Sequence, residues 1–583
     1  MGALLRAKDN CLCMQRKKTA SSIAPLASFT WLALIATWYA LIIIGLHYWG
    51  RITTAKVVGI YVHQAPTLAS VLGVPLSIFC AALIMAIALL IALAYRLRPT
   101  FDWTIEYICN AGKPKAIILA ILAIAASCIQ LNQMTNTITM TREPFGVSVL
   151  PGAASDRFES HQRGGSNAID ALEDKVRKNM PVRSSPKDAV NLIVIVSDAL
   201  RADHLGAYGY GRNTSPFLDE LIHTAASKDV VRNMRASCAE SNCGLMSIAS
   251  SRRVSATPRN PITLMEALKR HGYATHLILS GDHTNFYGLK EAYGTVDFYS
   301  DGTTQTTRYV NDDALVVDRI KQLPDLSSGA PPVAMQLHLM SAHGLGLRKP
   351  ESSRFKPLAN YYKDPSLSAE RKEVRQAGVN YYDDGVAEVD RTIQAVISIL
   401  SKKGYLKRTL LVLTADHGEM LGEHGRFSHA SQVYEPALNI PFILIRYGYA
   451  GNGLAPHIMS SQIDIAPTIL TDMGIAPPSS WAGLALQLDK DHENYYFQQG
   501  DLSGLYTRRK QGGILKYWTD LKTGTDYAFD ISSDGAEVNN ISGSLDSVYL
   551  SKLRFLSLSG SIANGTQDDS QSNPARFRGQ SRN

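Results

Sequence analysis

Cysteine is scarce in this chain, with seven residues among 583. Five of the seven lie within the first 130 residues, so only Cys238 and Cys243 remain for the rest of the chain. A concentrated basic segment is also lacking, because the formal net charge of +8 is spread over short groups such as residues 16–18 and 508–510. Scattered charge of this kind does not indicate nucleic-acid binding, and no nucleic-acid partner is expected. We find no internal repeat.

Long apolar runs are confined to the amino-terminal part, where they span residues 27–49, 70–95 and 116–131. The first two are long enough to cross a bilayer, which takes roughly 20 apolar residues, whereas the third is marginal. We therefore expect residues 1–132 to form a membrane anchor of about three transmembrane helices. The alternative is that the third run lies in the membrane interface or packs as a core helix, which would leave the large domain in the cytoplasm.

Lys and Arg residues around these runs predict the orientation. Five precede the first run, two separate the first from the second, and four separate the second from the third. This asymmetry places the amino terminus inside. Three crossings then predict a multi-pass protein of the plasma (inner) membrane with a large extracytoplasmic, periplasmic domain. There Cys238 and Cys243 could form a disulfide, although their spacing does not establish the geometry.

In the rest of the chain, the residue pattern changes at residue 189. Residues 133–188 are mixed in composition and read as a linker with at most one helix. From residue 189 on, short runs rich in β-branched residues alternate with helical patterns. The β-branched runs lie at residues 189–197, 274–280, 333–340, 409–415 and 441–447. Continuous apolar strands separated by helices predict an α/β fold with a largely parallel sheet covered by helices on both faces.

One helix and the limits of this domain follow from the same patterns. Apolar residues recur at helical steps from Val386 to Leu400, and Gly404 follows as a stop. We expect one domain over residues 189–556, with a smaller carboxy-terminal part from about residue 481. Residues 557–583 are rich in Ser, Asn, Gln and Gly and are expected to be a disordered tail.

Metal-type ligands follow three of the predicted strands. Asp198 ends the first strand, Asp416 and His417 follow the strand at 409–415, and His343 follows the strand at 333–340. His429 lies in the loop beyond Asp416. An isolated Asp after a strand is most often a helix cap, and an isolated His is usually structural. Together, however, carboxylate oxygens and imidazole nitrogens at the carboxyl ends of strands suit zinc or manganese at a hydrolytic centre.

Several blocks resemble the sulfatase-like branch of the alkaline phosphatase superfamily. They are SDALRADHLGAYGYGRNTSPFLDEL (197–221), TADHGEMLGEHG (414–425), VYEPALNIPFILIR (433–446) and DIAPTIL (464–470). The likeness runs from about residue 190 to 545. DIAPTIL and the later FDISSDGAEVNNIS look more like sulfatases proper, whereas the membrane anchor and the spacing of the His and Asp residues look more like lipid A phosphoethanolamine transferases.

Position by position, this resemblance implies roles for individual residues. It makes Asp198, Asp416 and His417 ligands of a principal metal, together with the nucleophile. His343 and His429 match the family's residues that hold the transferred group or a second metal.

Two further positions bear on the pocket and on the metal. His283 falls where sulfatases place a Lys and a His near the substrate, and we expect it to be a pocket residue. Sulfatases usually carry two adjacent acids in the first block, whereas here the second is Ala199. This departure weakens a calcium site built from many carboxylates and favours zinc as the divalent cofactor, with manganese or calcium as alternatives.

The nucleophile separates two kinds of enzyme. Sulfatases of the usual kind need a Cys or Ser in a CxPSR-like context, which is oxidised to formylglycine, and neither Cys238 nor Cys243 has that context. The phosphotransferase relatives use an unmodified Thr or Ser on the metal at the start of a helix, where the positive helix end favours an anion. Ser241 is the best-placed candidate, although an alignment without a gap selects Ser237. A Cys243 thiolate matches a phosphoryl site poorly.

Three functional hypotheses follow. The first is a membrane-anchored metalloenzyme that cleaves or transfers a phosphate-type ester through Ser241, on a lipid headgroup or an envelope glycan. The second is sulfate-ester hydrolysis on the same scaffold, because the two ester classes share tetrahedral shape. The third is a catalytically silent domain that binds an envelope polymer.

Overall fold

The protein was studied as a computed structural model of all 583 residues. The structure describes residues 34–45, 53–72, isolated positions between 77 and 96, 167–183, 188–253, 256–304, 308–349, 353–362, 372–510 and 512–562. The chain divides into two compact units: one comprises residues 1–158 with 285–288, and the other comprises residues 159–284 with 289–583.

The first unit contains the predicted membrane anchor. Residues 34–45, within the first apolar run, are helical, and α2 (Ala55–Leu72) follows between the first and second runs. Among the residues that the structure describes, no helix combines the length and the apolar character that a membrane crossing requires. Most of the second run and the whole of the third lie outside the described residues, so the membrane anchor stays a prediction.

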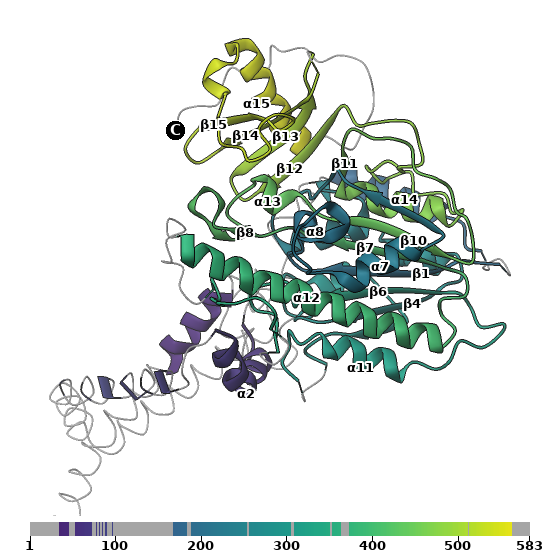
Figure 1. The fold of residues 1–583 in the computed structure, drawn as a ribbon, viewed down its shortest axis with the longest axis horizontal. Helices are drawn as coiled ribbons and strands as arrows, with labels where there is room; N and C mark the ends of the chain where they lie inside the picture. The colour runs from purple at the N-terminus through teal and green to yellow at the C-terminus, as the bar shows by residue number, and fades with distance from the viewer. Residues whose placement is uncertain are drawn as a thin grey trace, which may run out of the picture. The chain divides into compact units, whose positions relative to one another are not determined.

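The second unit is built on a seven-stranded sheet (Figure 1). Its strands lie in the order β2 (Ser227–Val231), β10 (Phe442–Tyr447), β7 (Thr409–Ala415), β1 (Asn191–Ser197), β6 (Val333–Leu339), β4 (Ala274–Leu279) and β5 (Phe298–Ser300). Only β10 runs against its neighbours, so the predicted, largely parallel sheet is confirmed. Strands β1, β6 and β7 are buried at every position, which explains their continuous apolar sequences.

Helices pack around this sheet in two groups. The long helix α12 (Lys372–Lys402) crosses the sheet in Figure 1 and packs against α7 (Pro216–Thr224) and α11 (Ala314–Gln322). Helix α8 (Ser241–Ser250) packs against α9 (Leu264–Arg270) and α14 (Ile465–Asp472). Helix α12 starts well before the predicted Val386, and it ends two residues before Gly404, whose φ of 83° suits a helix stop.

The carboxy-terminal part is a separate antiparallel sheet with one helix. Its strands are β12 (Asn494–Gln499), β13 (Leu502–Arg508), β14 (Ile514–Asp520) and β15 (Thr525–Asp530). Helix α15 (Ser547–Ile562) packs on the first three strands, and Leu553 joins the small core. The prediction of a disordered tail from residue 557 was wrong for residues 557–562, because the helix continues there with Ser557 buried against the sheet.

The predicted linker also needs a correction. Its expected helix is α6 (Asn167–Asn179), but this helix belongs to the folded body. Glu173 is only 1% exposed, receives a hydrogen bond from the backbone N–H of Ile262 at 2.6 Å, and pairs with the fully buried Arg252 at 3.1 Å. A buried carboxylate that is held in this way fixes the helix to the body. Residues 133–166 lie outside the described part of the chain.

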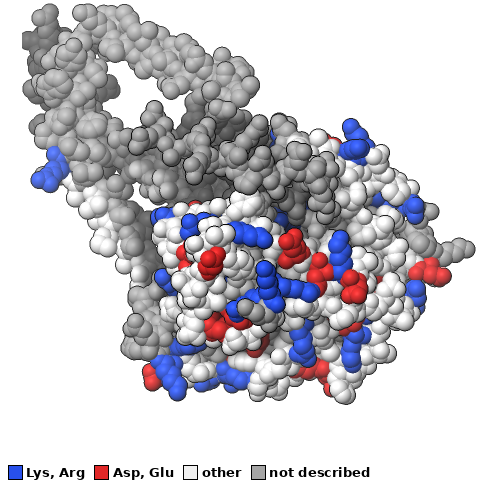
Figure 2. All heavy atoms as spheres, turned by 90° about the horizontal axis from the view of Figure 1, so that it is seen from above, with Lys and Arg blue, Asp and Glu red and all other residues white. Residues whose placement is uncertain are grey.

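Figure 2 shows one face of the surface. On it, Lys and Arg are interspersed with Asp and Glu among uncharged residues. A mixed surface of this kind does not offer the continuous basic stripe with which proteins follow a phosphate backbone.

Candidate active site

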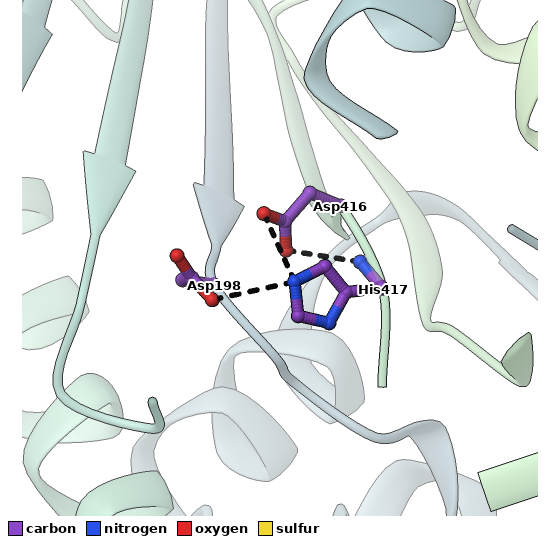
Figure 3. Close-up of side chains that lie close together, drawn as sticks. All are labelled: Asp198, Asp416 and His417. Carbon is purple, nitrogen blue, oxygen red and sulfur yellow. Dashed lines mark hydrogen bonds and ion pairs between the residues drawn. The ribbon is translucent and has the colours of Figure 1, made fainter. Parts of the chain in front are cut away.

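The carboxyl ends of β1 and β7 bring three predicted ligands together. Asp198 directly follows β1, while Asp416 and His417 directly follow β7, and these two strands are neighbours whose last residues pair. All three side chains are buried, and one ligand atom from each lies within 4.8 Å of the others. Figure 3 shows both carboxylates next to the same nitrogen of the imidazole.

The ring of His417 is oriented by its own loop. Its Nδ1 lies 2.7 Å from the carbonyl oxygen of Gly418, so Nδ1 carries the proton and donates it there. Burial lowers the pKa of His417, which keeps the ring neutral. The lone pair on Nε2 therefore faces Oδ1 of Asp198 at 3.6 Å and Oδ2 of Asp416 at 3.7 Å (Figure 3).

The two carboxylates are left incompletely satisfied. Oδ1 of Asp416 accepts hydrogen bonds from the backbone N–H groups of Ala199 at 3.1 Å and His417 at 2.9 Å. Its Oδ2, and Oδ1 of Asp198, are buried and have no hydrogen-bond partner among the described residues. Burial and the like charge of Asp416 raise the pKa of Asp198 well above its usual range. Two orphaned oxygens beside an imidazole lone pair fit a divalent cation.

Ser241 completes this cluster from helix α8. It is the first residue of the helix, and its Oγ lies 3.2 Å from Oδ2 of Asp198 and 3.2 Å from Nε2 of His417. Gly244 allows the approach, because a β-carbon there would lie 2.2 Å from the carbonyl oxygen of Asp416. The hydroxyl therefore sits at the positive end of a helix and against the carboxylate cluster.

Ser237, the other predicted candidate, points elsewhere. Its Oγ lies 2.6 Å from Oγ of Ser247 and donates to Oε1 of Gln462 at 3.1 Å. On either side of Ser241 along the chain, Cys238 and Cys243 form a disulfide with a Cα–Cα distance of 6.3 Å, within the usual range. The disulfide closes a short loop around Ser241.

Tyr362 connects the two other predicted histidines. Its hydroxyl oxygen lies 3.2 Å from Nε2 of His343 and 3.3 Å from Nδ1 of His429. The backbone N–H of Leu345 donates to Nδ1 of His343, so Nε2 carries that ring's proton. Burial lowers the pKa of His343 well below its usual range, and the ring is neutral. The ring centroid of His429 lies 4.3 Å from that of His417, so His429 borders the cluster, and the ring centroid of His343 lies 5.2 Å from that of His429.

Glu419 is a site residue that the sequence reasoning missed. Its buried Oε1 lies 3.1 Å from Nδ1 of His429, and its Oε2 accepts from the hydroxyl of Tyr361. Burial alone lowers the pKa of His429, but the Glu419 carboxylate outweighs it and raises the pKa to about 9. His429 is thus a cation at neutral pH. Glu419 lies in the quoted DHGE block, so a signal was present, whereas nothing in the sequence pointed to Tyr362.

His283 occupies a different buried group. Its Nε2 lies 3.1 Å from Nδ1 of His338 and 3.1 Å from the carbonyl oxygen of Ser280, and its Nδ1 lies 3.2 Å from the hydroxyl of Tyr293. Burial and His338 lower the pKa of His283 to about 3. None of these contacts reaches Ser241 or the two carboxylates. The structure thus buries His283 beside His338, with an electrostatic interaction but no hydrogen bond to Asp416 of the cluster among the described residues, and its role as a pocket residue stays a prediction.

Known proteins resemble this chain over the same region. The Sulfatase family profile matches residues 190–475. Arylsulfatase K of Mus musculus is 28% identical over 199 residues, which cover 31% of this chain and 35% of that protein. This chain therefore spans about a third of the length of that relative.

Two solved structures are also similar to this chain. The phosphonate monoester hydrolase of Agrobacterium radiobacter is 16% identical, with a TM-score of 0.49 and coverage of 64% of this chain and 96% of that one. The soluble domain of lipooligosaccharide phosphoethanolamine transferase A from Neisseria meningitidis is 19% identical, with a TM-score of 0.43 and coverage of 52% and 96%. The profile match thus identifies residues 190–475 as a Sulfatase domain, and the strand-end residues Asp198, Asp416 and His417 lie within it.

Proposed function

We propose that this protein is a metal-dependent hydrolase or transferase that acts on phosphate-type esters through a covalent Ser241 intermediate. The observation that carries the proposal is the position of the Ser241 hydroxyl, 3.2 Å from both Asp198 and His417 at the start of α8. A hydroxyl in such a place is a candidate nucleophile because the helix end favours its anion, and a cation held by the cluster would offset the negative charge of the two carboxylates.

Asp198, Asp416, His417 and Ser241 would hold the cation. Two carboxylates, one imidazole and one hydroxyl match zinc first, and manganese or calcium are the alternatives. When bound, the cation would supply Lewis acidity, which lowers the pKa of the serine hydroxyl and offsets negative charge on the transferred group. The orphaned oxygens of Asp198 and Asp416 support this assignment, since their burial without a partner is otherwise costly.

The protein's own groups can then carry the transfer. Oγ of Ser241 forms a bond to phosphorus, its proton passes to water, and the bond from phosphorus to the ester oxygen breaks. His429, a cation at neutral pH, gives that leaving oxygen the proton of Nε2 while Nδ1 stays paired with Glu419. His343 donates from Nε2 toward the transferred oxygens as a neutral group. The oxygen of water or of an acceptor hydroxyl next attacks the phosphorus and its proton passes to Nε2 of His429, while the bond from phosphorus to Oγ breaks and Ser241 regains a proton from water.

The second candidate is a sulfatase. It is favoured by the matching curated relative, an arylsulfatase, and by the DIAPTIL block, which lies in α14. Sulfate and phosphate esters share a tetrahedral shape but differ in charge. A few pocket residues can therefore determine which of the two ester classes the enzyme prefers. Under either candidate, we propose an extracytoplasmic, membrane-anchored enzyme whose substrate is a lipid headgroup or an envelope glycan.

The proposal is tested by turnover of p-nitrophenyl phosphate, bis-p-nitrophenyl phosphate and p-nitrophenyl sulfate by the full chain, with zinc, manganese or calcium. Phosphate or diester turnover that disappears in Ser241→Ala supports the phosphotransfer route. Sulfate turnover alone supports the sulfatase. A chain that binds no stoichiometric metal and turns over none of the three esters would instead be a silent binding protein.

A further inference from the structure

The side-chain amide of Gln499 lies between the two loops that carry Ser241 and His429. Gln499 is the last residue of β12, in the carboxy-terminal sheet, and is 7% exposed. Its Oε1 accepts a hydrogen bond from the backbone N–H of Ala239 at 3.1 Å. Its Nε2 donates to the carbonyl oxygen of Ala430 at 3.0 Å. Ala239 lies two residues before Ser241, and Ala430 directly follows His429, so one amide group joins both loops.

A third contact uses the remaining donor of the same amide. Nε2 of Gln499 also donates to Oε2 of Glu240, at 3.1 Å, and Glu240 is the residue immediately before Ser241. Beside it, the backbone N–H of Gln498 donates to the carbonyl oxygen of Ser237 at 2.9 Å. The edge of β12 therefore supports the loop before α8 at two successive residues.

The loop of His429 needs such support because its backbone is strained. Ser428 and Ala430, on either side of His429, have φ values of 73° and 67°, in the left-handed region that residues with a β-carbon rarely adopt. Ala430 is held there from across the site: its N–H donates to the carbonyl oxygen of Ala239 at 2.8 Å, and its carbonyl accepts from Gln499. Strain of this kind persists only where the surroundings impose it.

Only an amide provides all three contacts at once. Glutamate in place of Gln499 would keep an acceptor for Ala239 but lose both donors, and it would set a carboxylate against that of Glu240 and the carbonyl of Ala430. Methionine would keep the length and remove every hydrogen bond. The chemistry of the side chain, and not its volume alone, is therefore what holds the loops together.

We propose that Gln499 is a positioning residue that sets the separation of Ser241 and His429 across the site, and thereby the rate of group transfer rather than the binding of the ester. The inference rests on the proposed roles of those two residues. We call the three hydrogen bonds of the Gln499 amide the clamp. Because reacting groups must meet within a few tenths of an ångström, loss of the clamp lowers kcat by roughly 10-fold to 100-fold and changes KM by less than about threefold.

The test compares the full-length wild-type chain with Gln499→Met and Gln499→Glu. Gln498→Glu is the matched control, because successive residues of a strand point to opposite faces and this change adds the same charge on the other face. We would measure kcat and KM with the p-nitrophenyl ester that the wild type turns over best. Amide hydrogen exchange in a peptide covering residues 426–433 serves as a readout that does not depend on activity.

The expected result is a loss of kcat in both Gln499 variants, faster exchange of the Ala430 amide, and wild-type behaviour of Gln498→Glu. Gln499→Met with kcat within twofold of wild type, or with unchanged exchange at residues 426–433, would overturn the inference. A general rise in exchange over β1, β6 and β7 would also overturn it, since that pattern marks a merely structural residue. Turnover that survives Ser241→Ala would overturn the proposed function itself. Turnover that is lost in Ser241→Ala but unchanged in both Gln499 variants would reject only the role of the clamp.

Discussion

Nδ1 of His429 lies 3.1 Å from Oε1 of Glu419, and the carboxylate of this pair is fully buried. The contact gives the two histidines different protonation states, because no described carboxylate pairs with His343 and burial lowers the pKa of that ring. One ring is therefore a cation and the other a neutral donor at neutral pH. This division suits a site that must protonate a leaving group and also bind an anion.

The Glu419 pair predicts a pH-dependent stability. Burial opposes the charge on His429, yet Glu419 raises its pKa to about 9, above the ordinary value of 6.5. A histidine with a raised folded-state pKa contributes its full stabilisation below about pH 6.5 and loses it as the pH rises through 9. We expect the chelator-treated chain to lose up to about 3 kcal/mol of unfolding free energy between these values, measured by urea denaturation. In Glu419→Gln, the unfolding free energy should change less with pH over this range. A wild-type unfolding free energy that stays constant over this range would contradict the prediction.

The two serines should respond in opposite ways to alanine. Ser241→Ala removes the hydroxyl beside Asp198 and should lower turnover by more than about 10³-fold while sparing the fold. Ser237→Ala removes contacts with Ser247 and Gln462 and should cost about 1 kcal/mol of stability with activity kept within a few-fold. Steady-state kinetics and thermal unfolding of both variants check this, and the reverse pattern would assign the nucleophile to Ser237.

Asp198→Asn should separate stability from function. Burial and the charge of Asp416 raise the pKa of Asp198, and a carboxyl with a raised folded-state pKa destabilises the fold increasingly as the pH rises above about 4. At pH 7 the substitution should therefore stabilise the metal-free chain by about 1–3 kcal/mol. It should also abolish metal-dependent turnover and the gain in melting temperature that zinc confers on the wild type. Calorimetry with and without zinc tests both effects, and an unchanged response to zinc would remove Asp198 from the ligand set.

The disulfide around Ser241 should contribute to both stability and rate. Cys238 and Cys243 close a loop with a sequence separation of 5, for which chain entropy predicts about 2 kcal/mol. Replacing both with alanine should lower the unfolding free energy by about that amount and lower kcat, because the loop before α8 gains freedom. Treating the wild type with a reductant should reproduce the change, while full activity in both cases would mean that the rest of the loop suffices.

Much of the fold could be predicted from local pattern. The five predicted strands lie within a residue or two of their predicted positions, because buried parallel strands need continuous β-branched sequences that stand out from their surroundings. The first part of α12 escaped prediction for the opposite reason. It buries Tyr382 and Asp383, and Asp383 is satisfied by His204 and Tyr210, so the helix lacks an apolar stripe there.

The sequence by itself placed the candidate ligands Asp198, Asp416 and His417 at the strand ends, since a residue directly after a buried parallel strand must lie at one edge of the sheet. It also determined the family, through motifs that keep their order along the chain. Only the tertiary structure set Ser241, and not Ser237, against Asp198 and His417, paired His429 with Glu419, buried His283 beside His338 and set Gln499 against Ala239 and Ala430. Those choices depend on the close approach of α8 to β7 and on contacts between segments 69 and 260 residues apart, which no local pattern encodes.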